Sequence, residues 1–183
     1  SRTLISMIVS FVLVGAVMFA FYKVNAIAAI TTSTLNVFLS LVFYNAVGME
    51  FSSGGLVGLI VVFILGIYSA IVYFTKVKDE LYRGRTMKKA NAEASKKSNA
   101  LIIDASLVIF AVGMIAYVLG GPSLQGYATF TIFGSVLNLI LVLLGNKILI
   151  WLLTNNTNTQ KNFALIGVDA TKVPNILKEE KQT

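Results

Sequence analysis

The chain of 183 residues has no cysteine, no histidine and only two prolines. Without cysteine it can form no disulfide, offers no thiol nucleophile and has no CxxC redox motif. Without histidine it also lacks the usual zinc ligands and the commonest general base near neutral pH. The sequence contains no Ser/His/Asp triad, P-loop or GxGxxG motif. We therefore expect neither an enzyme nor a bound metal or cofactor.

Charge is scarce as well, with 13% charged against 56% hydrophobic residues and a mean hydropathy of +0.80. Soluble domains are usually about 25% charged, so this composition predicts an integral membrane protein. The net charge of +7 does not indicate a nucleic-acid partner, because eight of the 15 basic residues lie in one segment between apolar runs. In a membrane protein such a segment determines topology.

Five apolar segments are long enough to cross a bilayer, which requires about 20 residues. They are residues 4–22, 25–47, 55–74, 99–119 and 126–144, with the last extending as far as 153. The predicted fold is all-α: one domain of five transmembrane helices over residues 1–153, followed by a flexible tail over 154–183. The first run lacks a small-residue cleavage site and is too long for a signal peptide. Because the chain opens with Ser1, we expect a fragment of a longer protein.

The basic segment, residues 76–98, is predicted to lie in the cytoplasm by the positive-inside rule. Its basic residues are Lys76, Lys78, Arg83, Arg85, Lys88, Lys89, Lys96 and Lys97. The tail 154–183 then falls on the same side, whereas the loops 48–54 and 120–125, with one acid and no base, fall outside. Contact with anionic lipid headgroups is a second expected role, and Lys147 is expected to reach the headgroups from the last helix.

Local structure is predicted within this segment too. Residues 76–81 are expected to continue the helix 55–74 beyond the bilayer, and Gly84 to end it. Residues 86–97, rich in alanine and lysine, have two open interpretations. They form either a short interfacial helix or a solvated loop with only a topological role.

Small and hydrogen-bonding side chains recur at intervals of three, four and seven residues within the spans. Such spacing indicates the packed faces of membrane helices, where small residues allow close approach. The stripes are Ala29, Ser33, Asn36 and Ser40; Ser106, Gly113 and Gly120; and Gly134 with Asn138. We interpret them as the seams of the bundle.

Asp104 is the one acidic residue in the five predicted spans. An ionised carboxylate there costs several kcal/mol unless it has polar partners or water. We expect Asp104 to be sheltered between helices, with Ser33, Asn36 and Ser40 as candidate partners. Two roles remain open: a carboxyl that only pins helices together, and a site that binds a proton.

The run from Lys76 to Ser106 resembles the membrane domain of SecD in the SecD/SecF protein-export family. The matching elements occur in order: Lys76-Val77-Lys78-Asp79-Glu80-Leu81, Gly84, Lys88-Lys89-Ala90 and Ile102-Ile103-Asp104-Ala105-Ser106. Further similarities flank this run: Asn36, Gly48, Gly54-Gly55-Leu56-Val57-Gly58, Gly120, Gly126-Tyr127-Ala128 and Lys147. The resemblance covers about residues 4–153.

The resemblance implies the second to sixth helices of a SecD half, within the resistance-nodulation-division superfamily. It implies an auxiliary subunit of the Sec translocon in the bacterial cytoplasmic membrane, assisting protein export or insertion with energy from the proton-motive force. The implied partners are membrane lipids, a second SecF-like half on the same or another chain, the Sec translocon and the translocating polypeptide. Two alternatives stay open: a small-molecule or lipid exporter of the superfamily, and a non-transporting translocon scaffold.

The sequence departs from the family at one important element. The family has a membrane-embedded aspartate in an Asp-Ala-Asn element, and the matching positions here are Tyr68, Ser69 and Ala70. Loss of that acid favours the scaffold alternative. The residues that the resemblance then marks as candidates for ion coupling are Asp104, Asn36, Ser106, Tyr68 and Ser69.

Overall fold

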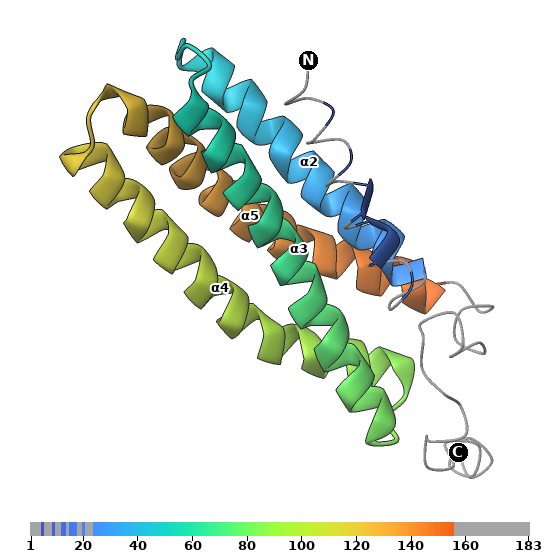
Figure 1. The fold of residues 1–183 in the computed structure, drawn as a ribbon. Coiled ribbons are helices and arrows are strands. Elements are labelled where there is room, and N and C mark those ends of the chain that lie inside the picture. The colour runs from blue at the N-terminus through green and yellow to red at the C-terminus, as the bar shows by residue number, and fades with distance from the viewer. Residues whose placement is uncertain are drawn as a thin grey trace, which may run out of the picture.

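The chain folds into long helices laid side by side (Figure 1). The computed structural model describes residues 24–155. Before them it also describes positions 5, 9, 12, 13, 15–17 and 20, and each of these single positions is helical. The long helices are α2 (Val24–Ala46), α3 (Ser53–Tyr82), α4 (Met87–Leu119) and α5 (Pro122–Asn155). The predicted all-α class is confirmed, and the described residues contain no strand. Most of the predicted helix 4–22 and nearly all of the tail lie outside the described residues.

Helix α3 continues without a break from the apolar run into the charged residues 76–82, as the sequence predicts. Ser52 caps its first turn, because its hydroxyl accepts a hydrogen bond of 3.2 Å from the Gly55 amide. The helix ends before Gly84, which adopts a positive φ of 82°. Only glycine takes up this left-handed conformation without steric cost, so Gly84 ends the helix and turns the chain.

The segment after the turn differs from both interpretations of its sequence. Residues 87–119 form one uninterrupted helix, α4, so residues 86–97 are neither a separate interfacial helix nor a loop. Alanine and lysine favour helix, and neither glycine nor proline occurs between Gly84 and Gly113. The helix therefore extends across the change from basic to apolar sequence.

The turn between α4 and α5 is shorter than predicted. Only Gly120 and Gly121 separate the two helices, in place of the expected loop 120–125, and Pro122 occupies the first position of α5. Proline suits this position, since the first amide of a helix has no partner within the helix. Gly120, which we expected on a packed helix face, lies in this turn instead.

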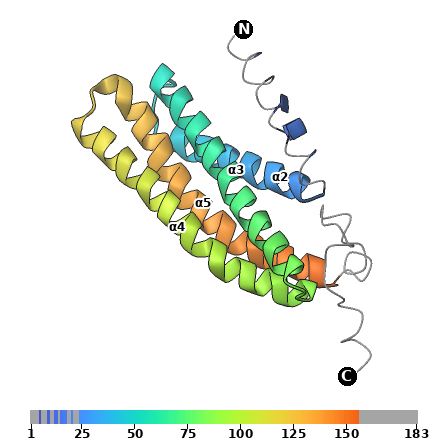
Figure 2. The same cartoon turned by 60° about the horizontal axis from the view of Figure 1, so that its bottom comes forward.

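Helices α3 and α5 form the middle of the bundle. Helices α2 and α4 each pack against both of them and lie on opposite sides of that pair (Figures 1 and 2). Among the described helices α3, α4 and the Pro122–Val142 part of α5 are long and apolar enough to span a membrane. At 1.5 Å per residue, the 30 residues of α3 measure about 45 Å, so its charged end must project beyond a hydrocarbon layer about 30 Å thick.

Glycines let the central helices approach closely. A Cβ on Gly134 of α5 would overlap the side chain of Val62 on α3, and a Cβ on Gly113 of α4 would lie 2.6 Å from Thr131 Oγ1 on α5. On the other side of α3, a Cβ on Gly66 would lie 2.9 Å from Ser33 Oγ of α2. Close backbone approach of this kind replaces the hydrophobic effect as a source of helix association in lipid.

Gly134→Ala should destabilise the bundle by about 1–3 kcal/mol, the usual cost of overpacking a close-packed core. Val62 is fully buried and β-branched, so it cannot move aside cheaply. The free energy of unfolding in bicelles measures the effect. Gly121→Ala is the control, because a Cβ there meets nothing within 4 Å. Equal stability of the two variants would contradict the described contact between α3 and α5.

Candidate functional site

A junction of three polar side chains joins α3, α4 and α5 inside the bundle. The amide nitrogen Nδ2 of Asn138 donates to Ser69 Oγ at 2.9 Å and to Ser106 Oγ at 3.2 Å. Ser69 in turn donates to the Leu65 carbonyl at 2.8 Å. All three side chains are 1% exposed. Their polar groups therefore cannot bond to solvent, and they satisfy one another by hydrogen bonding. We call this cluster the polar junction.

Each member of the polar junction belongs to a buried stripe of its helix. On α4 the stripe is Met87, Asn91, Ala94, Ser98, Ile102, Ser106 and Gly113, at spacings of three, four and seven residues. On α5 Asn138 follows Gly134 by four residues and precedes the buried Val142 by four. These periods bring each polar side chain to the inner face of its helix. The sequence placed Ser106 and Asn138 on seams, but the link through Ser69 was not predicted.

Asp104 lies outside the polar junction. Two residues along a helix turn the side-chain direction by about 200°, so Asp104 projects from the opposite face of α4 to Ser106. It is exposed in this chain, and the expectation that the helices described here shelter it is wrong. Tyr68 is likewise 42% exposed, although its neighbour Ser69 is buried.

The polar stripe of α2 is buried but does not face Asp104. Ser33, Asn36 and Ser40 are at most 1% exposed, and their helix packs on α3 and α5. The side-chain polar atoms of all three have no hydrogen-bond partner among the described residues. The predicted pairing of these residues with Asp104 is therefore wrong, because α4 lies on the far side of the α3–α5 pair.

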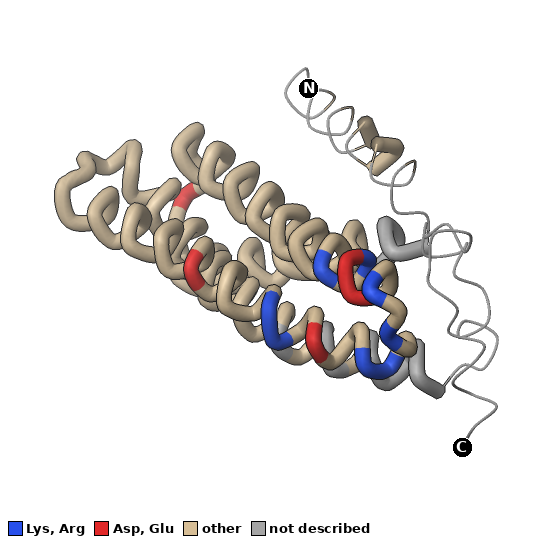
Figure 3. Tube along the Cα trace, turned by 90° about the horizontal axis from the view of Figure 1, so that it is seen from below, with Lys and Arg blue, Asp and Glu red and all other residues tan. Residues whose placement is uncertain are grey.

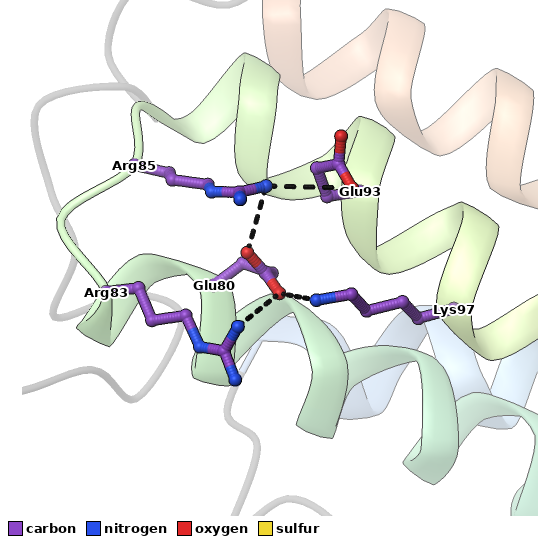
Figure 4. Close-up of polar contacts among 5 residues, drawn as sticks. All are labelled: Glu80, Arg83, Arg85, Glu93 and Lys97. Carbon is purple, nitrogen blue, oxygen red and sulfur yellow. Dashed lines mark hydrogen bonds and ion pairs between the residues drawn. The ribbon is translucent and has the colours of Figure 1, made fainter.

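A second cluster, of charged side chains, holds the turn between α3 and α4 (Figure 4). Glu80 is its centre and its side chain is only 2% exposed. Its carboxylate lies 2.6 Å from Lys97 Nζ, 3.2 Å from Arg85 and 3.7 Å from Arg83. Arg85 also lies 3.6 Å from Glu93 of α4. We call these five residues the Glu80 cluster.

The electrostatics of the Glu80 cluster favour the charged carboxylate. Glu80 lies in the charged last turns of α3, beyond its apolar stretch. The hydrogen bond from Lys97 lowers the pKa of Glu80 below its ordinary value of 4.5; burial opposes this, and the nearby Arg85 charge supports it. Sequence reasoning assigned Arg83, Arg85 and Lys97 to topology and missed Glu80. The available signal was the mixture of acidic and basic residues on both sides of Gly84.

The remaining basic residues lie at the same end of the molecule. Figure 3 shows that the blue segments gather toward the end of the bundle with the α3–α4 turn, whereas some red segments lie farther along it. Lys88, Lys89 and Lys96 are exposed, whereas Lys76 and Lys78 are half-buried. Lys147 belongs to α5, but its side chain lies outside the described part of the structure. One end of the bundle is therefore strongly basic on its surface, as a membrane–water boundary requires.

Comparison with known proteins identifies a family and individual proteins that are similar in sequence to this chain. The family described as "Protein export membrane protein SecD/SecF, C-terminal" matches residues 1–155. The protein translocase subunit SecD of Alicyclobacillus acidocaldarius is 25% identical over 144 residues, which cover 78% of this chain and 33% of that protein. The protein translocase subunit SecDF of Bacillus subtilis is 20% identical over 181 residues, 99% of this chain and 25% of that protein. The chain thus spans a quarter to a third of these relatives.

Removing the amide of Asn138 should weaken the contact of all three helices. In double-mutant cycles, Asn138→Ala should couple to Ser69→Ala and to Ser106→Ala by about 0.6 kcal/mol each, and by no more than about 1.7 kcal/mol, the range for hydrogen bonds between membrane helices. For each cycle, the unfolding free energy is measured in bicelles for the unaltered protein, the two single variants and the double variant. Ser33→Ala, a buried serine on α2, is the control and should show no coupling. Coupling to Ser33 but not to Ser69 would refute the polar junction.

Glu80→Gln should loosen the α3–α4 turn, because the neutral amide loses its ion pairs with Arg85 and Lys97. Faster amide hydrogen exchange in residues 78–97 measures the effect, and Asp79→Asn, at an exposed acid, should leave exchange unchanged. The pKa of Glu80 is lowered on folding, so its stabilising contribution is complete above pH 4.5 and is lost as the pH falls through the lower folded value. A turn that loosens between pH 8 and 6 instead would contradict this assignment.

Proposed function

Since this chain belongs to the SecD/SecF family of protein export membrane proteins, we propose that it is part of an auxiliary subunit of the Sec protein translocon. The observation that carries the proposal is the family match over residues 1–155, which includes every described helix. Both reported relatives are protein translocase subunits. This favours protein export or membrane insertion over the export of small molecules or lipids.

The proposed location is the bacterial cytoplasmic membrane, with the basic end of the bundle in the cytoplasm. Three of the described helices can span a membrane, and the basic residues gather at one end of them (Figure 3). Lys88, Lys89 and Lys96 are exposed there and can contact anionic headgroups. The proposed protein partners are the Sec translocon and the translocating polypeptide.

A second, SecF-like half is the proposed partner within the membrane. The outer face of α4 carries a stripe of exposed residues at spacings of three and four: Leu101, Asp104, Val108, Ala111, Ile115 and Val118. This spacing suits a helix that packs along α4. A carboxylate on a lipid-facing surface costs several kcal/mol. A partner helix that donates a hydrogen bond or a positive charge to Asp104 would remove that cost.

Asp104 is the proposed site of coupling to the proton-motive force. Among the described residues, no aspartate or glutamate is buried in the apolar parts of the helices, where the buried polar groups are hydroxyls and amides. A carboxyl at the contact between two halves can exchange a proton when the contact opens. Moving one charge through the membrane potential provides about 2.3 kcal/mol per 100 mV.

The scaffold function is the second candidate, and it also has support in the structure. The position that matches the family's embedded aspartate is Tyr68, which is 42% exposed and makes none of the hydrogen bonds of the polar junction. The polar junction joins three helices through neutral groups, which suits a rigid support. The two candidates differ in what Asp104 does.

Asp104→Asn separates them, because the amide keeps the size of the side chain but cannot carry charge. If Asp104 couples export to the gradient, the variant should lose the gradient-stimulated part of export, down to the level of cells without the protein. Export of a secreted precursor is measured with an intact gradient and after addition of a protonophore. Asp79→Asn is the control, since Asp79 is exposed in the charged end of α3.

Co-purification with translocon subunits completes the experiment. Asp104→Asn should still co-purify, which attributes its defect to coupling and not to assembly. Gradient-stimulated export at the normal rate in this variant would exclude coupling through Asp104 and leave the scaffold function. Failure of the unaltered protein to co-purify would contradict the translocon assignment itself.

A further inference from the structure

A small cavity of about 30 Å³ lies between α2, α3 and α5. Its walls include Thr32 of α2, Ser69 and Tyr73 of α3, and Gly145 of α5. The remaining lining residues are Ala29, Gly66, Ala70, Phe74, Leu141 and Val142. The cavity therefore adjoins the polar junction through Ser69. Three of its lining side chains, those of Thr32, Ser69 and Tyr73, carry hydroxyl groups.

Tyr73, one of the lining residues, has a buried hydroxyl that lacks a partner among the described residues. Its side chain is 2% exposed, and its hydroxyl makes no hydrogen bond among the described residues. A buried tyrosine hydroxyl normally finds a partner, because an unpaired polar group in an apolar interior is costly. Something polar in the cavity would satisfy it.

Ser69 offers the second contact. Its hydroxyl donates to the Leu65 carbonyl and accepts from Asn138, which leaves one lone pair unused. Ser69 and Tyr73 are four residues apart on α3, so they lie one above the other on the same face of the helix. One small molecule between them can accept from the Tyr73 hydroxyl and donate to Ser69 Oγ.

We propose that this cavity is a water-binding site. A space of about 30 Å³ exceeds the 10–15 Å³ that one water molecule requires, and two or more polar partners line it. No lining residue is charged, which disfavours an ion. The bound water links Tyr73 to the polar junction, so that one hydrogen-bonded chain runs from Ser106 through Asn138, Ser69 and the water to Tyr73.

This series of hydrogen bonds brings water close to the charged end of the bundle. Tyr73 lies three residues before Lys76, which is about 4.5 Å along the helix axis. Ser69, the other proposed partner of the water, lies seven residues before Lys76, so the water site lies within about two turns of the basic end. The interior of this half is then wet on the side of the basic end, independently of what Asp104 does.

Water-edited solid-state NMR on the tyrosine-labelled protein in lipid bilayers tests the proposal. The chain has seven tyrosines, and the signal that disappears in Tyr73→Phe identifies Tyr73. Polarisation should pass from water to Tyr73 at a rate comparable to that for Tyr82, which is exposed at the charged end of α3. Tyr68, exposed on the apolar part of α3, should receive little. Transfer to Tyr73 no faster than to Tyr68 would show a dry cavity and overturn the proposal.

A serine pair tests the binding partner. Ser69→Ala should abolish the fast transfer to Tyr73, because the water loses its second contact. Ser135→Ala removes a buried serine that does not line the cavity and should leave the transfer unchanged. Fast transfer that survives in Ser69→Ala would overturn the role of Ser69. The measurement on the unaltered protein stands even if a variant fails to fold.

Discussion

The hydrogen bonds from Asn138 to Ser69 and Ser106 are the interaction on which the architecture depends. They join three helices at one point, in an environment where apolar surfaces gain nothing by leaving lipid for protein. The glycine contacts around them allow the helices to come close enough for these bonds to form. Because every member is neutral, the polar junction can stay dry or take up water without a change in charge.

The placement of charge follows from the same constraint. Charged groups are found where water is available: in the Glu80 cluster, the carboxylate is surrounded by Lys97, Arg85 and Arg83 at the end of α3. Asp104 is the exception, since it lies on an apolar outer face of α4. The bundle does not provide this carboxylate with a partner of its own among the described residues. A protein surface that covers it is the simplest way to remove the cost of its charge.

Much of the architecture could be predicted from the sequence because it depends on local periodicity. Apolar runs located α2 to α5, and the stripes that contain Ser33, Ser106 and Asn138 are buried except at Gly120, which lies in a turn. Contacts between helices were harder to predict, because the spacing within a helix does not say which neighbour its face meets. Asp104 was therefore assigned to the interior only because a carboxylate exposed to lipid is costly in free energy. In the structure Ser106, two residues further on, occupies the inner face of the helix instead. Glu80 was missed because its partners come together only when Gly84 turns the chain.

Cysteine reactivity tests most directly whether Ser106 faces inward and Asp104 outward. The chain has no native cysteine, so Asp104→Cys and Ser106→Cys each introduce a single thiol. With the isolated chain in detergent, we predict that a small maleimide labels Asp104→Cys quickly and labels Ser106→Cys only after unfolding. Fast labelling at 106 together with protection at 104 would contradict the account.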